Sequence, residues 1–155
     1  MNAEIDTLIA ALRRLPDQLA ELTAELSTQQ LTTVFIPGEW TVAQNVHHVV
    51  DSHLNSYIRC KLIITEDRPT LRPYDQDLWA AVPDSGEADI NISLALLRSL
   101  HERWARFWES LPADAWQRVG LHPESGELTL AMILPMYVAH GEAHLDQIRR
   151  TLAAA

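Results

Sequence analysis

Apolar residues recur at helical spacing through most of this chain, and Pro and Gly divide that pattern into a few long segments. Side chains three and four positions apart share one face of a helix, so each segment presents an apolar stripe. We find no stretch with the sustained polar–apolar alternation of a strand. The pattern therefore predicts an all-α protein in which the apolar stripes of separate helices pack on one another.

We expect four long helices, over about residues 3–28, 42–65, 94–110 and 130–152. Thr41 and Ser93 are suitable N-caps for the second and third helices, because their hydroxyls can accept a bond from the first helical turn. Pro16 should kink or split the first helix, and Pro135 should bend the last one or mark its start. Four amphipathic segments within 155 residues predict a four-helix bundle that forms a single domain over 1–155.

Two connecting segments contain no helical pattern. EDRPTLRPYDQD is a crossover broken by Pro, and VGLHPESGELT is expected to be a loop that leads into the last helix.

The charge of the chain argues against several classes of partner. It has 12 Lys and Arg against 21 Asp and Glu, which gives a net charge of −9 with His neutral. Nucleic acid and anionic lipid would repel such a protein, and no basic cluster compensates. Apolar runs such as LAMILP are far shorter than the roughly 18 residues of a membrane span.

The expected compartment is a reducing cytoplasm. Cys60 is the only cysteine, so the chain has neither a disulfide framework nor a cysteine zinc cage. The N-terminus carries acids before its apolar stretch and Arg13 and Arg14 after it, which is the wrong order for a signal peptide.

His140 and His144 lie four residues apart in the last predicted helix, so both imidazoles can face one point. On a helical wheel they are about 40° apart, at the edge of the apolar arc. One further His from a neighbouring helix would make a three-nitrogen metal site with an open position, as in catalytic zinc sites. The pair lacks the Glu of a zinc-protease HExxH motif, and two structural histidines can have the same spacing. From the residues alone, both interpretations stay open.

The second predicted helix carries one polar stripe opposite its apolar face. Its residues are His48, Asp51, Ser52, Asn55 and Arg59. Such a stripe either faces solvent or lines a water-accessible pocket, in which Asp51 and Asn55 would lie beside a metal or a substrate. If this helix supplies a metal ligand, its geometry favours His48 over His47 and His53.

Four stretches of the chain closely resemble the YfiT-type proteins of the DinB-like superfamily, which are described as metal-dependent hydrolases and as bacillithiol S-transferases. These stretches are GEWTVAQNVHHVVDSHLNSYIRCKLIITEDRPTLRPYDQDLWAAVPDS, SLALLRSLHERW, HPESGELTL and YVAHGEAHL. The resemblance extends from about Leu12 to Arg150 and keeps the order and spacing of the segments.

The resemblance implies an up-down-down-up four-helix bundle of DinB-like type, commonly a homodimer. It also implies one divalent metal ion, zinc or nickel, held in a cleft by three histidines. In this sequence those positions are His48, His140 and His144.

The function we expect is a metal-dependent thiol S-transferase of the bacillithiol type, which joins a low-molecular-weight thiol to an electrophilic small molecule. One alternative is a metal-dependent hydrolase that activates water. Another, of a different class, is a non-catalytic, metal-stabilised dimeric binding protein. A thiol-dependent isomerase is a further enzymatic alternative. Asp51 is the best candidate for orienting a ligand or moving a proton, and weaker pocket candidates are Asn55, Arg59 and Tyr74. His101 and His122 receive no role.

Overall fold

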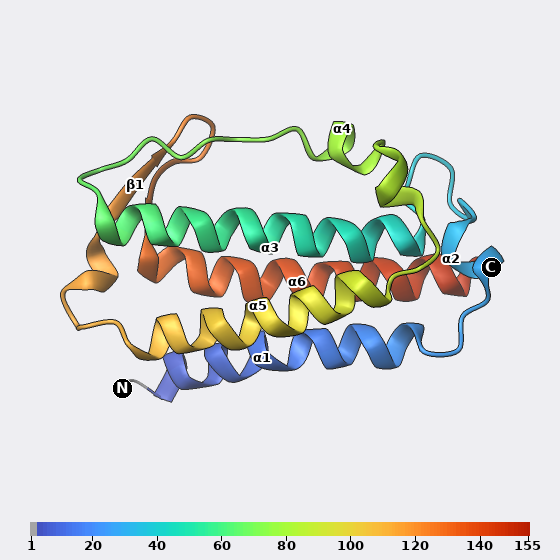
Figure 1. Cartoon of the computed structure of the whole chain (residues 1–155), viewed down its shortest axis with the longest axis horizontal. Coiled ribbons are helices and arrows are strands. Elements are labelled where there is room, and N and C mark those ends of the chain that lie inside the picture. The colour runs from blue at the N-terminus through green and yellow to red at the C-terminus, as the bar shows by residue number, and fades with distance from the viewer. Residues whose placement is uncertain (1–2) are drawn as a thin grey trace.

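The computed structural model describes residues 3–155, and four long helices dominate it (Figure 1). These helices are α1 (Ala3–Thr23), α3 (Val42–Thr65), α5 (Asn91–Glu109) and α6 (Leu130–Ala153). Helix α1 packs against α5 and α6, and α3 packs against the same two helices. The shorter elements are α2 (Thr28–Thr32), α4 (Gln76–Ala80), the 3₁₀ turns η1 (Pro83–Gly86) and η2 (Ala115–Gln117), and the strands β1 (Val119–His122) and β2 (Gly126–Thr129).

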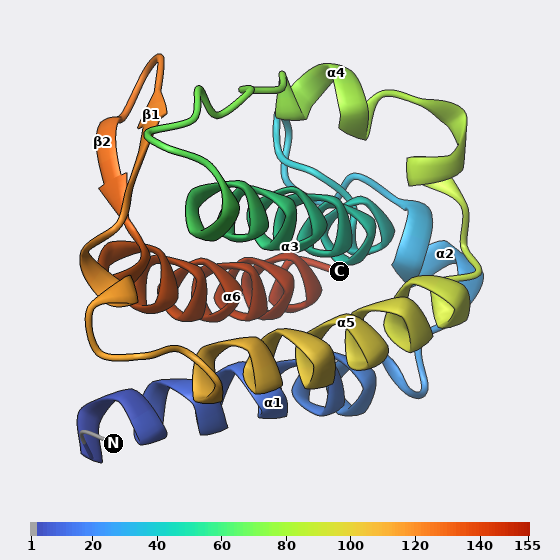
Figure 2. The ribbon, with the colours of Figure 1, turned by 60° about the vertical axis from the view of Figure 1, so that its left-hand side comes forward.

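The bundle has the predicted up-down-down-up topology. In Figures 1 and 2, α1 and α6 run in one direction, whereas α3 and α5 run in the other. Because α3 and α5 are consecutive long helices that point the same way, the chain must return along the bundle between them. Residues 66–90 make this crossover beside α3 and carry α4 and η1. The all-α, four-helix prediction is confirmed.

Helix α3 begins and ends where the sequence predicts. The hydroxyl of Thr41 accepts a bond from the backbone N–H of Gln44 (3.1 Å), and the Gln44 side chain accepts one from the N–H of Thr41 (3.0 Å). This capping box satisfies two of the N–H groups that a helix start leaves without partners. It fixes where α3 starts, and His48 therefore lies two turns into the helix.

The first and third helices differ from their predicted bounds. Helix α1 ends at Thr23 rather than near residue 28, because Ser27 caps a separate helix, α2, by a capping box with Gln30. Helix α5 begins at Asn91, and Ser93 is not its cap. The Ser93 hydroxyl instead bonds the ring of His47, at 2.8 Å from Nδ1.

The prediction that VGLHPESGELT is a loop is wrong, because this segment forms a β-hairpin. Strands β1 and β2 pair antiparallel, from Val119 opposite Thr129 to His122 opposite Gly126. Gly126 has φ of +75°, which few other residues adopt readily. Strands of four residues are too short to show a clear alternation. Backbone bonds from Leu71 and Leu121 tie the crossover to this hairpin.

Pro16 does not split α1, which is continuous through it. Proline has no N–H, so the carbonyl of Leu12, four residues earlier, loses its helical partner. The ring of His101 on α5 takes that place, with Nδ1 at 2.6 Å from the Leu12 oxygen.

The interior of the bundle holds two apolar clusters. One includes Val46 and Leu97, and the other includes the fully buried Trp104 and Trp108. Across residues 3–155, no helix combines the length and hydropathy that a membrane crossing would need.

Candidate metal centre

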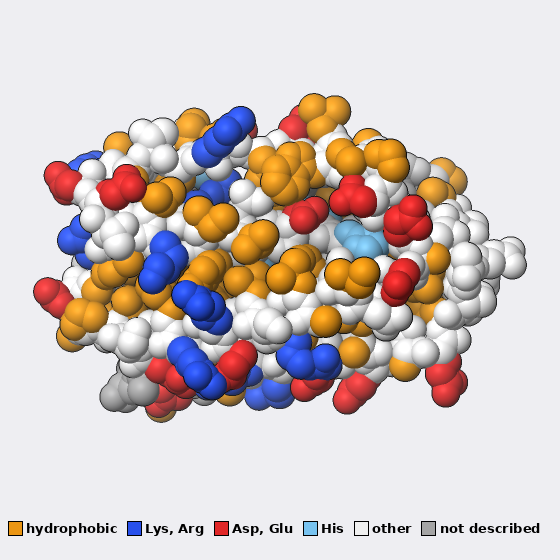
Figure 3. Space-filling model, in the orientation of Figure 1, with side chains coloured by type: hydrophobic (Ala, Val, Ile, Leu, Met, Phe, Trp, Pro, Cys, Tyr) orange, Lys and Arg blue, Asp and Glu red, His pale blue; other side chains and the backbone are white. Residues whose placement is uncertain are grey.

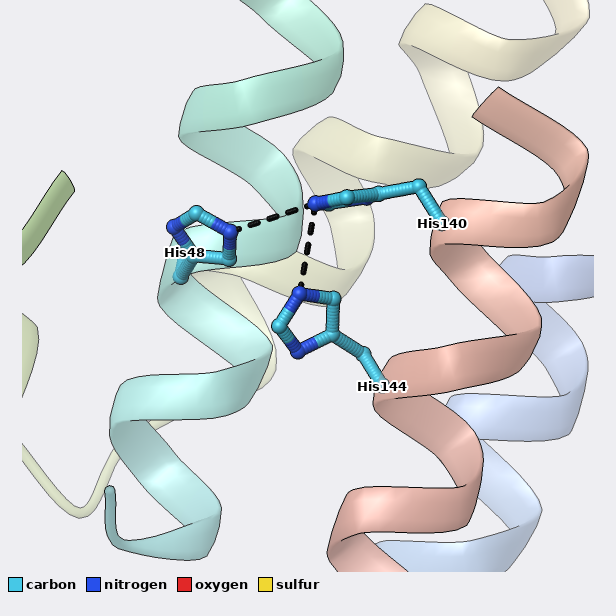
Figure 4. Close-up of side chains that lie close together, drawn as sticks. All are labelled: His48, His140 and His144. Carbon is cyan, nitrogen blue, oxygen red and sulfur yellow. Dashed lines mark hydrogen bonds between the residues drawn. The ribbon is translucent and has the colours of Figure 1, made fainter. Parts of the chain in front are cut away.

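Three histidines from two helices meet inside the bundle (Figure 4). His48 comes from α3, and His140 and His144 come from successive turns of α6. The Nε2 atom of His140 lies 3.3 Å from Nε2 of His48 and 3.2 Å from Nε2 of His144. One nitrogen from each ring lies within 4.8 Å of the other two. The structure therefore brings together the three residues that the sequence predicted as ligands.

The ring of His144 is held in one orientation by Asn45. The side-chain NH₂ of Asn45 donates to the carbonyl of Thr41 (2.9 Å), so its oxygen faces His144. That oxygen lies 2.9 Å from Nδ1 of His144 and can only accept, so Nδ1 carries the ring proton. In the neutral ring, Nε2 then presents a lone pair toward His140.

Burial keeps these rings neutral. It lowers the pKa of His48 and of His144 to about 4 and that of His140 to about 3. The neighbouring rings add a smaller effect for His48 and His140. Neutral imidazole is the form that binds a metal, so the cluster needs no deprotonation near neutral pH.

The spacing of the cluster fits a divalent metal. Zinc bound by imidazole at about 2.0–2.1 Å in a tetrahedral site requires nitrogens roughly 3.3 Å apart. Two of the three nitrogen separations, 3.2 and 3.3 Å, match this requirement, and the third, between His48 and His144, is within 4.8 Å. Three imidazoles suit zinc or nickel, and three protein ligands leave room for a substrate. The side chains that could hold the metal are thus His48, His140 and His144.

Two cavities reach the cluster, and both are lined by His140 and Gln76. The larger, of about 600 Å³, lies among α3, the crossover, the hairpin and α6, and its walls include Ser52, Arg59, Tyr74, His122, Glu124 and Tyr137. The smaller, of about 300 Å³, is lined on its other sides by Gly38, Glu39, Trp40, Asp77, His144 and Gln147. The Trp40 ring stacks on that of His144, with their planes 7° apart.

Arg59 and Tyr74, two predicted pocket residues, both line the larger cavity. The Arg59 Nη2 donates to the carbonyl of Arg72 (2.6 Å), which anchors the side chain, while its buried Nε has no partner in the protein. Burial raises the pKa of Tyr74, so its hydroxyl stays protonated.

Asp51 and Asn55 do not line either of these cavities. Asn55 donates to the carbonyl of Asp51 (2.8 Å) within α3. Asp51 borders a separate hollow of about 210 Å³ with Trp79 and Asp84, and burial raises the pKa of its carboxyl. The polar stripe of α3 therefore divides, because only part of it faces the histidine cluster.

Two histidines outside the predicted ligand set, His53, which was ranked below His48, and His101, which received no role, are fully buried and connect to the cluster. The His53 ring lies 3.2 Å from Nδ1 of His140 and 2.8 Å from His101. The sequence could have indicated that His101 is buried, because it falls on the apolar stripe that Leu97, Trp104 and Trp108 form on α5. A buried imidazole needs a partner for each of its polar atoms. His122, also unassigned, lines the larger cavity.

Comparison with known proteins identifies the family. A sequence profile described as the DinB superfamily matches residues 11–148. The chain belongs to the DinB superfamily.

Curated relatives of this superfamily member come from several Bacillus species. Proteins from Bacillus cereus and Bacillus thuringiensis are each 44% identical over 96% of this chain and 87% of their own length, and both are named "Putative metal-dependent hydrolase". The predicted family is confirmed, and the prediction of a metal-dependent enzyme agrees with the names of these relatives.

Solved structures give the same fold. The Bacillus subtilis protein YfiT, described as a probable metal-dependent hydrolase with an unusual four-helix bundle topology, superposes with a TM-score of 0.92. It is 39% identical, and the match covers 97% of this chain and 87% of YfiT. A mycothiol-dependent maleylpyruvate isomerase matches with a TM-score of 0.71 at 15% identity, over 92% of this chain and 59% of that protein. At that identity the likeness concerns the fold alone.

Proposed function

We propose that this protein binds one divalent metal ion through His48, His140 and His144 and transfers a low-molecular-weight thiol to an electrophilic small molecule. The observation that carries the proposal is the pair of cavities that share His140 and Gln76. A transferase must bring two organic substrates to one centre, and two cavities offer a place for each. A hydrolase needs one organic substrate and water.

When bound, the metal would lower the pKa of a thiol and so supply the reactive thiolate near neutral pH. The protein's own part is to hold the two substrates and to keep the three imidazoles neutral. The S–H proton would leave to solvent through the open cavities. The sulfur would then form a bond to the electrophilic carbon as the leaving group departs with its electron pair.

Arg59 gives the larger cavity a preference for a negatively charged group. Its Nε is buried without a protein partner, and a guanidinium hydrogen bonds carboxylate and phosphate well. We propose that the thiol substrate binds in this cavity and carries such a group, with Tyr74 beside it. Asp51 has no part in the proposal, because it borders a different hollow.

A metal-dependent hydrolase is the second candidate, and the names of the Bacillus relatives favour it. It would use the same three histidines, with water in place of the thiol. Two carboxylates, Asp75 and Glu124, line the larger cavity and could take up a proton from that water.

A conjugation assay distinguishes the candidates. The untagged protein is mixed with bacillithiol, mycothiol, glutathione or coenzyme A and a chlorinated electrophile, with and without zinc or nickel, and the products are identified by mass spectrometry. The transferase proposal expects metal-dependent formation of one thioether. His144→Ala should abolish it, whereas His47→Gln, a neighbour of His48 outside the cluster, should not.

Two outcomes would count against the transferase. Metal-dependent cleavage of ester or amide substrates without thiol conjugation would favour the hydrolase. Untagged protein that binds no divalent ion would remove both enzymatic candidates.

We also propose that the protein is a homodimer. Exposed apolar residues occur four apart on two neighbouring helices, as Leu54 and Ile58 on α3 and as Met132 and Met136 on α6. Figure 3 shows hydrophobic side chains gathered across the middle of one face of the molecule. Apolar residues that gather on one face, rather than lie scattered singly, are typical of a surface that binds another protein.

A further inference from the structure

A line of three contacts, two of them buried and one partly buried, connects the histidine cluster to the backbone of α1, on the far side of the bundle. The carbonyl oxygen of Leu12 lies 2.6 Å from Nδ1 of His101. The other nitrogen of that ring, Nε2, lies 2.8 Å from Nδ1 of His53. The Nε2 atom of His53 lies in turn 3.2 Å from Nδ1 of His140.

The line begins at a group that can only accept a hydrogen bond. Pro16 has no N–H to offer the Leu12 carbonyl, and the carbonyl has no proton of its own. The Nδ1 atom of His101 must therefore carry the ring proton and donate it. His53 and His101 are both 0% exposed, and their hydrogen-bond partners are imidazoles and a backbone carbonyl rather than carboxylates, so each ring is neutral and carries one proton.

The direction of every later bond follows. With its proton on Nδ1, His101 accepts at Nε2 from Nδ1 of His53. His53 then has only a lone pair at Nε2, which accepts from Nδ1 of His140. His140 is left with an unprotonated Nε2, and this is the atom that faces His48 and His144 (Figure 4).

This direction matters because a neutral imidazole has two tautomers, and only one of them suits the cluster. In the other, an N–H would occupy the position where the metal needs a lone pair. Asn45 already selects the proper tautomer of His144. Two lone pairs thus face each other at 3.2 Å, a contact that is repulsive without a cation and favourable around one.

We propose that His53 and His101 are positioning residues, which use the Leu12 carbonyl freed by Pro16 to hold His140 in the tautomer whose Nε2 can bind the metal. The proposal rests on the metal site proposed above. It concerns residues outside the three ligands, and it gives a structural reason for a proline in the middle of α1.

The test is an NMR measurement of imidazole tautomers. Protein labelled with ¹⁵N in its histidines is freed of metal, and two-bond ¹H–¹⁵N correlations are recorded above pH 7. We expect protonated Nδ1 and unprotonated Nε2 in His53, His101 and His140. A wild-type spectrum with the proton of His140 on Nε2 would overturn the proposal without any variant.

Variants at position 53 test the effect on metal binding. His53→Leu removes the acceptor for Nδ1 of His140, so a mixture of tautomers and a zinc affinity about 10–100-fold weaker are expected. His53→Gln offers a carbonyl oxygen in place of that acceptor and should restore the tautomer and most of the affinity. Equal losses of affinity in both variants, with the tautomer of His140 unchanged, would contradict a positioning role.

His47→Gln is the matched control, because the His47 ring bonds Ser93 and the carbonyl of Glu87 and has no place in the line. It should leave the tautomers and the zinc affinity unchanged. Zinc affinity is measured by competition with a chelator, without any substrate. Wild-type protein that binds no zinc would overturn the metal site, whereas the tautomers of the metal-free protein would still decide the orientation of the line.

Discussion

At the scale of single residues, the seven histidines of this chain differ in what their second ring nitrogen contacts. His144 is held by an amide oxygen and His140 by another imidazole, and both direct Nε2 into the cluster. His47 and His122 serve local structure: His47 bonds Ser93, and His122 accepts two backbone N–H groups in the hairpin turn. Spacing alone cannot separate these roles, because those of His47, His140 and His144 depend on partners far away in the sequence.

Arg59 is expected to set the affinity for the anionic substrate. Arg59→Met should raise KM for a carboxylate-bearing thiol about ten-fold, because it removes a charge-assisted hydrogen bond. With a neutral ester of the same thiol, KM should hardly change. Arg72→Met is the control, since Arg59 contacts only the Arg72 backbone carbonyl. Equal effects on both thiols would contradict a role in charge recognition.

The buried histidines predict how stability depends on pH. Burial lowers the folded-state pKa of His48, His101 and His144 to about 4, whereas an unfolded histidine titrates near 6.5. Between these values the unfolded chain binds more protons, so stability is full above about pH 6.5 and is lost as the pH falls toward 4. The Tm of metal-free protein should decrease over this range. His101→Gln should reduce the slope, and a constant Tm would contradict the prediction.

At the scale of elements, α6 brings its two histidines to α3 and also lies very close to α1. Gly141 stands between the histidines in sequence, and a Cβ built there would lie 2.4 Å from Cδ2 of Leu15. The glycine, which is unfavourable inside a helix, is thus explained by the close approach of α1. The contact brings α1 and α6 close together beside the three histidines.

Gly141→Ala is therefore expected to destabilise the protein. The change gains about 1 kcal/mol of helix propensity but overpacks a buried leucine at a cost of about 1–3 kcal/mol. A net loss of about 1 kcal/mol should lower Tm by roughly 2–4 °C in calorimetry. In combination with Leu15→Ala the loss should be smaller than the sum of the two, and Gly86→Ala, which meets no atom within 4 Å, should be neutral.

The elements that could be predicted from sequence are those with strong local signals. The capping box at Thr41 fixes the start of α3, and periodicity predicts α6 to within a residue or two. The hairpin was missed because its strands are four residues long, and its position depends on backbone bonds to the crossover. The prediction that Ser93 caps α5 was wrong because the Ser93 hydroxyl bonds His47, which is distant in sequence. The choice of His48 came from the family resemblance and was supported by helix geometry. A helical wheel could not show that Asp51 borders a hollow separate from the histidine cluster.

At the scale of the whole molecule, metal binding should act as a measurable stabiliser. Zinc at 100 times its Kd would add about 2.7 kcal/mol, which corresponds to a rise in Tm of about 5–10 °C. His144→Ala should lose this rise yet keep a metal-free Tm near that of the wild type, as expected for a site of catalytic type. A collapse of the metal-free Tm would instead indicate a structural role for His144.

The proposed dimer is tested by the molar mass in solution. Light scattering after gel filtration should give twice the 17.5 kDa of one chain. Ile58→Asp places a charge on the exposed apolar face of α3 and should shift the mass to that of a monomer. Gln18→Asp, at an exposed position of α1 rather than of α3 or α6, is a control for added negative charge. A monomeric wild type would contradict the proposal.

The crossover between α3 and α5 has a consequence for how such a protein can evolve. The three histidines belong to the bundle, whereas Tyr74, Asp75 and Gln76 belong to the crossover and His122 and Glu124 to the hairpin tied to it. Replacements in these two connecting segments would alter which molecules enter without touching the helices that gather the imidazoles. One scaffold can thus acquire new substrates while its three-histidine cluster is inherited intact.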